Sequence, residues 1–166
     1  MLHHSFFYGI ALSTVFLTMS PAWSEDIVHV FILSGQSNMV GAGEVPSQLS
    51  RNDGRGSLEW LTKNPVTAPH YRHLRNDDGS WKQRDDVQIC FFDKCGPLQP
   101  GYGSNQDKIG PELGFGCCIG DALDEPVLLI KIAWGGKSLA EDFRPPSLEG
   151  KTGIYYTKLL EQINNV

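Results

Sequence analysis

The sequence has 166 residues, enough for one domain with a hydrophobic core but not for two. Acidic residues outnumber basic ones by 19 to 14, and the formal net charge of -5 argues against nucleic acid or an anionic membrane surface as the main partner. The 18 glycines suit a loop-rich α/β protein better than a helical bundle, because glycine disfavours helix interiors.

Residues 1–24 are predicted to be a secretory signal peptide. The stretch from Phe6 to Met19 is apolar, and the small residues Ala22 and Ser24 mark a cleavage site. The alternative is an uncleaved membrane anchor, for which a run of about 14 apolar residues is short. The signal peptide predicts a secreted or periplasmic protein, free of the membrane after cleavage.

The run from Ile27 to Leu33 is short, rich in β-branched residues and barely alternating, which predicts a buried parallel strand. The polar segment 34–39 follows it, and a short helix is expected there with Ser37 or Asn38 near its amino end. In open α/β sheets the chemistry lies just past the carboxyl ends of such strands, so a serine here is a candidate nucleophile. Alternatively, the segment is a polar turn without a chemical role.

Residues 41–86 are expected to form a long irregular excursion, because Pro46, Pro65 and Pro69 interrupt it. Its aromatic and histidine side chains either line a sugar site or anchor a solvated loop. These side chains are His70, Tyr71, His73 and Trp81. A second strand is predicted at about 87–92, and a turn-rich loop at 98–107.

A helix is predicted over 111–123, with Pro111 at its first position and Glu112 in its first turn. A third strand, 127–133, leads into the segment 134–139, and a last helix is expected over 155–163. The sequence Gly-Gly-Lys-Ser at 135–138 is not a phosphate-binding loop, because that motif requires glycine where Lys131 stands.

The four cysteines are Cys90, Cys95, Cys117 and Cys118. Export would permit disulfides, and the first two could close a small loop, but three connectivities are open and the sequence selects none. The adjacent pair should point to different faces of its helix. Their spacing differs from that of zinc ligands, so no metal site is expected.

Three segments resemble the sialate O-acetylesterase-like carbohydrate esterases of the SGNH hydrolase superfamily. They are 31–43, which contains Gly-Gln-Ser-Asn, then Gly110–Gly116, and finally Trp134–Leu139. The resemblance implies an α/β fold, a three-layer flavodoxin-like parallel sheet truncated after the third strand and the following helix. Residues 25–166 would then be the amino-terminal portion of such an esterase domain.

The resemblance implies that Ser37 is the nucleophile, and that backbone N–H groups of Ser37 and of Gly135 or Gly136 form the oxyanion hole. The predicted substrate-binding residues are Gln36, Asn38, Glu112 and Arg144. The implied function is removal of O-acetyl groups from carbohydrates of sialate or xylan type. The implied partner is an acetylated carbohydrate, and no cofactor is needed.

In this family the general base is a histidine oriented by an aspartate, both in a later block, and the sequence ends at Val166 before that block. The histidines at 29, 70 and 73 are poorly placed substitutes. The favoured interpretation is a fragment that is inactive alone and leaves an apolar sheet edge uncovered. The alternative to a fragment is a genuinely short protein that dimerises or has lost catalysis. The alternative function is that of a secreted non-catalytic carbohydrate-binding domain or pseudoenzyme. A lipase-like esterase is disfavoured, because Ser37 lacks a Gly-x-Ser-x-Gly context.

Overall fold

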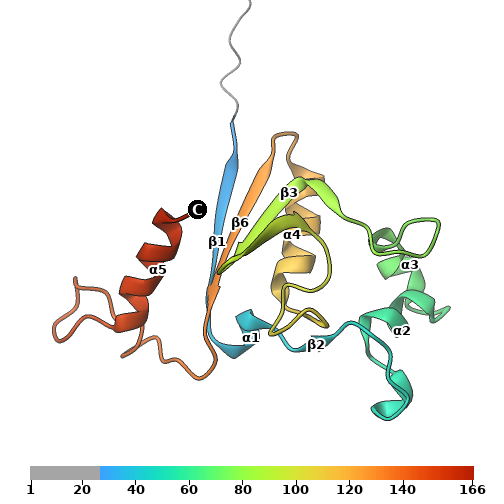
Figure 1. The fold of residues 1–166 in the computed structure, drawn as a ribbon, viewed down its shortest axis with the longest axis horizontal. Helices are drawn as coiled ribbons and strands as arrows, with labels where there is room; N and C mark the ends of the chain where they lie inside the picture. Colours follow the sequence, from blue (N-terminus) through green and yellow to red (C-terminus); the bar gives the residue numbers. More distant parts are fainter. Residues whose placement is uncertain (1–26) are drawn as a thin grey trace, which may run out of the picture.

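A four-stranded sheet forms the centre of the protein in the computed structural model, which describes residues 27–166 (Figure 1). Its strand order is β1-β6-β3-β4, formed by β1 (His29–Gly35), β6 (Val127–Ala133), β3 (Arg84–Phe91) and β4 (Lys94–Leu98). Both β1 and β3 run parallel to β6, whereas β4 returns antiparallel to β3. The predicted α/β class is confirmed, but the sheet is mixed rather than wholly parallel. The predicted signal peptide lies outside the described residues.

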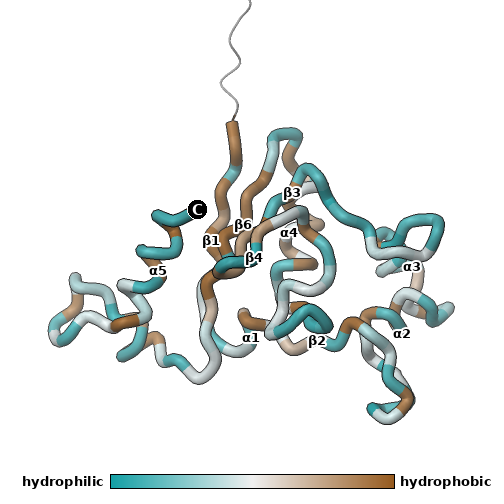
Figure 2. The backbone as a smooth tube through the Cα atoms, viewed as in Figure 1, coloured by the Kyte–Doolittle hydropathy of each residue, from teal (hydrophilic) through white to brown (hydrophobic). Residues whose placement is uncertain are grey.

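The central strand β6 has the predicted bounds. All of its residues except Leu128 are buried, because β6 has a hydrogen-bonded neighbour on each side. Pro126 precedes the strand and Gly135 follows it closely, and both residue types interrupt regular pairing. Figure 2 shows hydrophobic residues concentrated along β1 and β6.

β1 lies at the edge of the sheet, and its exposure alternates along the strand. Phe31 and Leu33 pack against the core, whereas Val30 and Ile32 on the other face are 52% and 49% exposed. The prediction that this strand is buried is therefore wrong, because β6 takes the central place. The predicted uncovered apolar edge is present in the described chain.

One helix covers one face of the sheet. α4 (Pro111–Ala122) packs against β3 and β6, and Phe115 meets Phe31 of β1 edge-on with 5.4 Å between ring centroids. The approach is close at Gly116, where a Cβ would lie 2.3 Å from Leu98. The least exposed residues of the core cluster under α4 include Val87, Ile89, Leu98, Val127 and Leu129.

The long excursion contains more regular structure than the sequence predicted. Its elements are β2 (Gly43–Glu44), η1 (Asn52–Gly54), α2 (Leu58–Lys63), α3 (Ala68–Tyr71) and η2 (Arg72–Leu74). Ser57 caps α2 by accepting a hydrogen bond from the Trp60 N–H at 3.2 Å. β2 pairs with the short strand β5 (Lys108–Ile109), and α2 and α3 lie to one side of the sheet (Figure 1).

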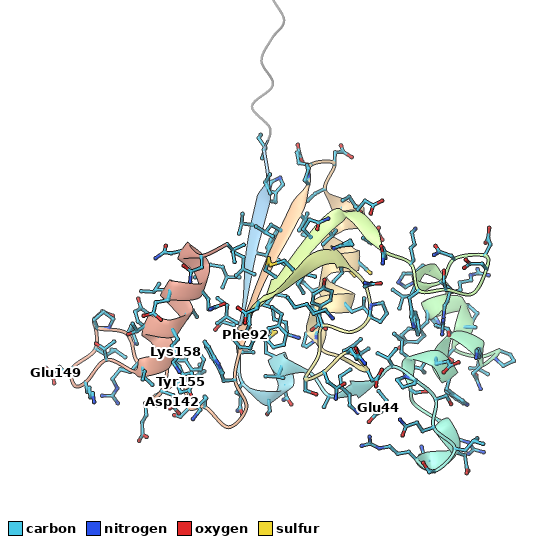
Figure 3. All side chains as sticks on the ribbon, in the orientation of Figure 1. Glu44, Phe92, Asp142, Glu149, Tyr155 and Lys158 are labelled. Atoms are coloured by element: carbon cyan, nitrogen blue, oxygen red, sulfur yellow. A yellow bond between two sulfur atoms is a disulfide. The ribbon has the colours of Figure 1, made fainter. Side chains whose placement is uncertain are left out.

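The last helix, α5 (Ile154–Asn164), joins the sheet through aromatic side chains. Trp134 lies 4.9 Å from Tyr155 and 5.3 Å from Phe92, measured between ring centroids. Figure 3 shows Tyr155 beside Asp142 at the start of α5, where the Tyr155 N–H donates to the Asp142 carbonyl. Among residues 27–166, each helix is too short or too polar to span a lipid bilayer.

A disulfide links β3 to β4. Cys90 and Cys95 face each other across the hairpin and are joined, whereas Cys117 is buried and Cys118 exposed, both as free thiols. The small loop that the sequence allowed is thus closed by a disulfide, no second disulfide forms within the described residues, and the two adjacent cysteines point to different environments as predicted. Burial raises the pKa of the Cys117 thiol, which keeps it protonated.

Replacing both Cys90 and Cys95 by alanine is expected to lower the free energy of unfolding by about 2 kcal/mol, because the cross-link restricts a short loop in the unfolded chain. The two residues are only five positions apart, so the effect should be modest. Urea unfolding followed by circular dichroism measures it. Cys118→Ala is the control and should leave the midpoint unchanged, and equal midpoints for both variants would contradict the prediction.

Candidate active site

Two loops leave the sheet side by side at the carboxyl ends of β1 and β6. Gly35 and Ala133 are paired at the end of the parallel register, and the Trp134 N–H donates to the Gly35 carbonyl at 3.2 Å. The segments 36–40 and 134–138 therefore start from adjacent positions at one edge of the sheet. This is where ligands bind in open α/β folds.

Ser37 is the first residue of α1 (Ser37–Val40), a single helical turn. Its side chain is exposed, and its Oγ donates to Gln36 Oε1 at 3.3 Å. The turn is closed by the N–H groups of Met39 and Val40, which both donate to the Gln36 carbonyl at 2.8 and 2.9 Å. The N–H of Ser37 has no acceptor within the helix, because first-turn donors have none. Ser37 thus presents a hydroxyl and a backbone donor at the strand end.

Glycine at position 35 permits this tight entry into α1. A Cβ on Gly35 would lie 2.9 Å from the Cβ of Met39, which is closer than real Cβ contacts. Gly135 and Gly136 in the opposite loop have open space around them, and Gly136 has a φ of +71° that favours glycine. Both glycines are exposed. The choice between their N–H groups as the second oxyanion donor stays a prediction.

The four residues predicted to bind substrate lie in different environments. Gln36 and Asn38 are exposed on either side of Ser37. Arg144 lies in the loop before α5, and its guanidinium donates to the carbonyls of Ala140 and Glu149 at 2.8 Å. Glu112 is buried at the start of α4. Only Gln36 and Asn38 lie next to the serine in the chain. The substrate contacts of Gln36, Asn38 and Arg144 stay predictions, whereas the predicted contact of Glu112 is ruled out because its carboxylate is buried.

The described histidines are distant from the serine. His29 begins β1, and at about 3.3 Å per residue the length of that strand places it roughly 20 Å from the Ser37 end. His70 and His73 lie in α3 and η2, well apart from α1 in Figure 1. The aromatic residue Trp81 in the excursion stacks under the Arg75 guanidinium, 3.3 Å from its ring centroid.

Sequence reasoning missed Lys131, which lies fully buried in the middle of β6. Its ammonium forms a salt bridge with Glu112 at 2.6 Å. A lysine within an otherwise apolar strand was the signal available in the sequence. Burial lowers the pKa of Lys131, and its hydrogen bond to Glu112 opposes this. Within residues 27–166 no group of three or more potential metal ligands occurs.

Comparisons with known proteins add the family. A search of curated proteins found no match. A crystal structure of an Arabidopsis thaliana protein is similar at 16% sequence identity, with a TM-score of 0.49, covering 82% of this chain and 50% of that one. The chain thus spans half the length of that protein. The family model described as carbohydrate esterase, sialic acid-specific acetylesterase, matches residues 27–166. Because this match covers most of the sequence, the chain belongs to the family of sialic acid-specific acetylesterases, which are carbohydrate esterases.

Proposed function

We propose that the protein is a serine esterase that removes O-acetyl groups from carbohydrates of sialate or xylan type, with Ser37 as its nucleophile. Membership of the carbohydrate esterase family supports the reaction class. The observation that carries the assignment is the place of Ser37, exposed at the first residue of α1 and directly past the carboxyl end of β1. A hydroxyl in this position is accessible to an ester, and a backbone donor lies beside it.

In the proposed reaction, Ser37 Oγ attacks the acetyl carbonyl and a histidine from outside this chain takes the serine proton. The N–H groups of Ser37 and of Gly135 or Gly136 hold the oxyanion, each such donor being worth about 2.7–4 kcal/mol of barrier. The histidine then gives this proton to the leaving sugar oxygen, which departs as a hydroxyl, and water hydrolyses the acetylated serine to release acetate. Gln36 and Asn38 flank the acetyl group and Arg144 completes the predicted substrate contacts, whereas Glu112 is buried and makes none.

Two finer assignments complete the proposal. The family supports the flavodoxin-like SGNH arrangement, with residues 25–166 as the amino-terminal portion of an esterase domain. The apolar run from Phe6 to Met19 supports residues 1–24 as a signal peptide. The protein would then act in a secreted or periplasmic location. An acetylated carbohydrate is its proposed partner.

The test uses the full-length protein, an O-acetylated sialic acid, acetylated xylan oligosaccharides and a fluorophosphonate probe. Acetate release is measured from each sugar, and the probe-modified peptide is identified by mass spectrometry. We expect acetate release from at least one sugar class and modification of Ser37. Sugar binding without acetate release would favour the non-catalytic alternative. Modification of another serine would show that the nucleophile assignment is wrong.

A further inference from the structure

A buried ion pair lies directly behind the nucleophile segment. The side chains of Lys131 in β6 and Glu112 in α4 are 0% and 1% exposed, and 2.6 Å separates Nζ from Oε2. The remaining Nζ donors bind two backbone carbonyls, those of Tyr102 at 2.6 Å and Val40 at 2.9 Å. All three N–H bonds of the ammonium are therefore used, and one of them ends on the last residue of α1.

Stability alone gives a weak reason for such a pair. Removing two charges from water is costly, and an apolar pair of similar volume is often as stable or more stable. A buried and fully hydrogen-bonded pair instead fixes geometry, because each partner tolerates only a narrow range of positions. The geometry fixed here is that of the backbone around Val40.

The nucleophile helix needs such support. α1 is one turn long, and a helix of this length does not persist without tertiary contacts. Its end is held at two successive carbonyls, Val40 by Lys131 and Gly41 by the Ser104 N–H at 2.9 Å. Glu112 Oε1 in turn accepts from the Gly110 N–H at 2.7 Å, so the start of α4 belongs to the same network.

We propose that Lys131 is a positioning residue, with Glu112 as its counter-ion, and that it holds α1 so that Ser37 points at the substrate. Neither side chain can touch the substrate itself, since both are buried. The catalytic consequence rests on the proposed esterase function, because a displacement of about 1 Å at a reacting group can cost about 10²-fold in rate. The structural consequence, an ordered α1, does not depend on that function.

The test is the double variant Lys131→Met with Glu112→Gln in the full-length protein, which leaves no unpaired buried charge. Hydrogen exchange of the Val40 and Gly41 amides is measured first, because both donate within α1. We expect exchange at these amides to be at least about 10-fold faster, with β3 and β6 unchanged. The control is Arg84→Met, which removes a cation bound to Asp121 near the other end of α4 and should leave α1 unaffected.

Steady-state kinetics supply the second measurement. We expect kcat to fall about 10–100-fold with KM within about threefold, because the substrate pocket is kept while the nucleophile is misplaced. Unchanged exchange in α1 would overturn the proposal whatever the activity. Faster exchange with unchanged kcat would overturn its catalytic half. If the wild-type protein releases no acetate, the esterase function fails while the exchange result still decides whether Lys131 holds α1.

If the double variant does not fold, the wild-type protein provides the decision. If Lys131 anchors α1 to β6, α1 should unfold only together with β6. The hydrogen-exchange protection factors of the Val40 and Gly41 amides should then lie within about 10-fold of those in β6. A single turn that frays independently would show almost no protection. Such fraying would overturn the proposal.

Discussion

Replacing Ser37 by alanine is expected to lower kcat/KM for acetyl-ester hydrolysis by the full-length protein at least about 10⁴-fold, because no acetyl-enzyme can form. Folding should be unaffected. The Ser37 side chain is exposed, and the hydrogen bond given up is that of its Oγ to Gln36 at 3.3 Å. Acetate release under first-order conditions gives kcat/KM, and a thermal melt of the same preparation confirms the fold.

Ser34 offers a matched control for this change. It is also an exposed serine, three residues upstream in β1, and Ser34→Ala removes the same hydroxyl oxygen from a neighbouring position. An exposed substitution of this kind should leave kcat/KM within about twofold. Retention of more than a tenth of the activity in Ser37→Ala would rule out the serine mechanism. A loss in both variants would indicate that the segment is sensitive to any change.

Replacing Gly41 by alanine should lower the free energy of unfolding by at least about 3 kcal/mol. The first cause is its φ of +86°, which L-residues with a side chain rarely adopt. The second is contact, since the new Cβ would lie 2.3 Å from Gly110 Cα and 2.5 Å from the Ile109 carbonyl oxygen. Because Gly41 directly follows α1, relief of this clash should displace the nucleophile and lower kcat about 10²-fold.

Gly56 separates the two causes. It has nearly the same φ, +83°, but no atom lies within 4 Å of the Cβ that alanine would add. Gly56→Ala should therefore cost only about 1–2 kcal/mol from backbone strain and leave kcat unchanged. Chemical denaturation and kinetics on both variants test the comparison. Equal destabilisation would show that the contact of Gly41 with Gly110 is unimportant.

The elements that the sequence predicts well are those whose pattern is local. β6 is bounded by Pro126 and Gly135 and contains an apolar run, and α4 begins at a proline, as expected. β4 was not predicted, because Gly96 and Pro97 disfavour strands. These residues are extended because β4 pairs with β3 and the disulfide joins the two strands. The edge position of β1 could not be predicted from the sequence either. Its apolar side chains on both faces predict a buried strand, whatever the order of strands in the sheet.

In the candidate site, too, features set by neighbouring residues could be predicted and features set by tertiary contacts could not. The placement of Ser37 beyond a strand and at a helix start follows from neighbouring residues. Glu112 was assigned to the substrate because its segment, Gly110–Gly116, resembles the esterase family. Its burial depends on Lys131, 19 positions away, and their hydrogen bond becomes visible only when α4 packs on β6.

The pairing of β1 with β6 has a consequence for synthesis of the protein. The two strands lie about 100 residues apart, so at about 5–20 residues per second the ribosome completes β6 about 5–20 s after β1. During that interval the apolar first strand has no sheet to join, which makes it a target for chaperones. The loops that carry Ser37 and Gly135 come together only after the polypeptide has grown past Ala133. The slow long-range pairing of β1 with β6 is then the step that forms the candidate site.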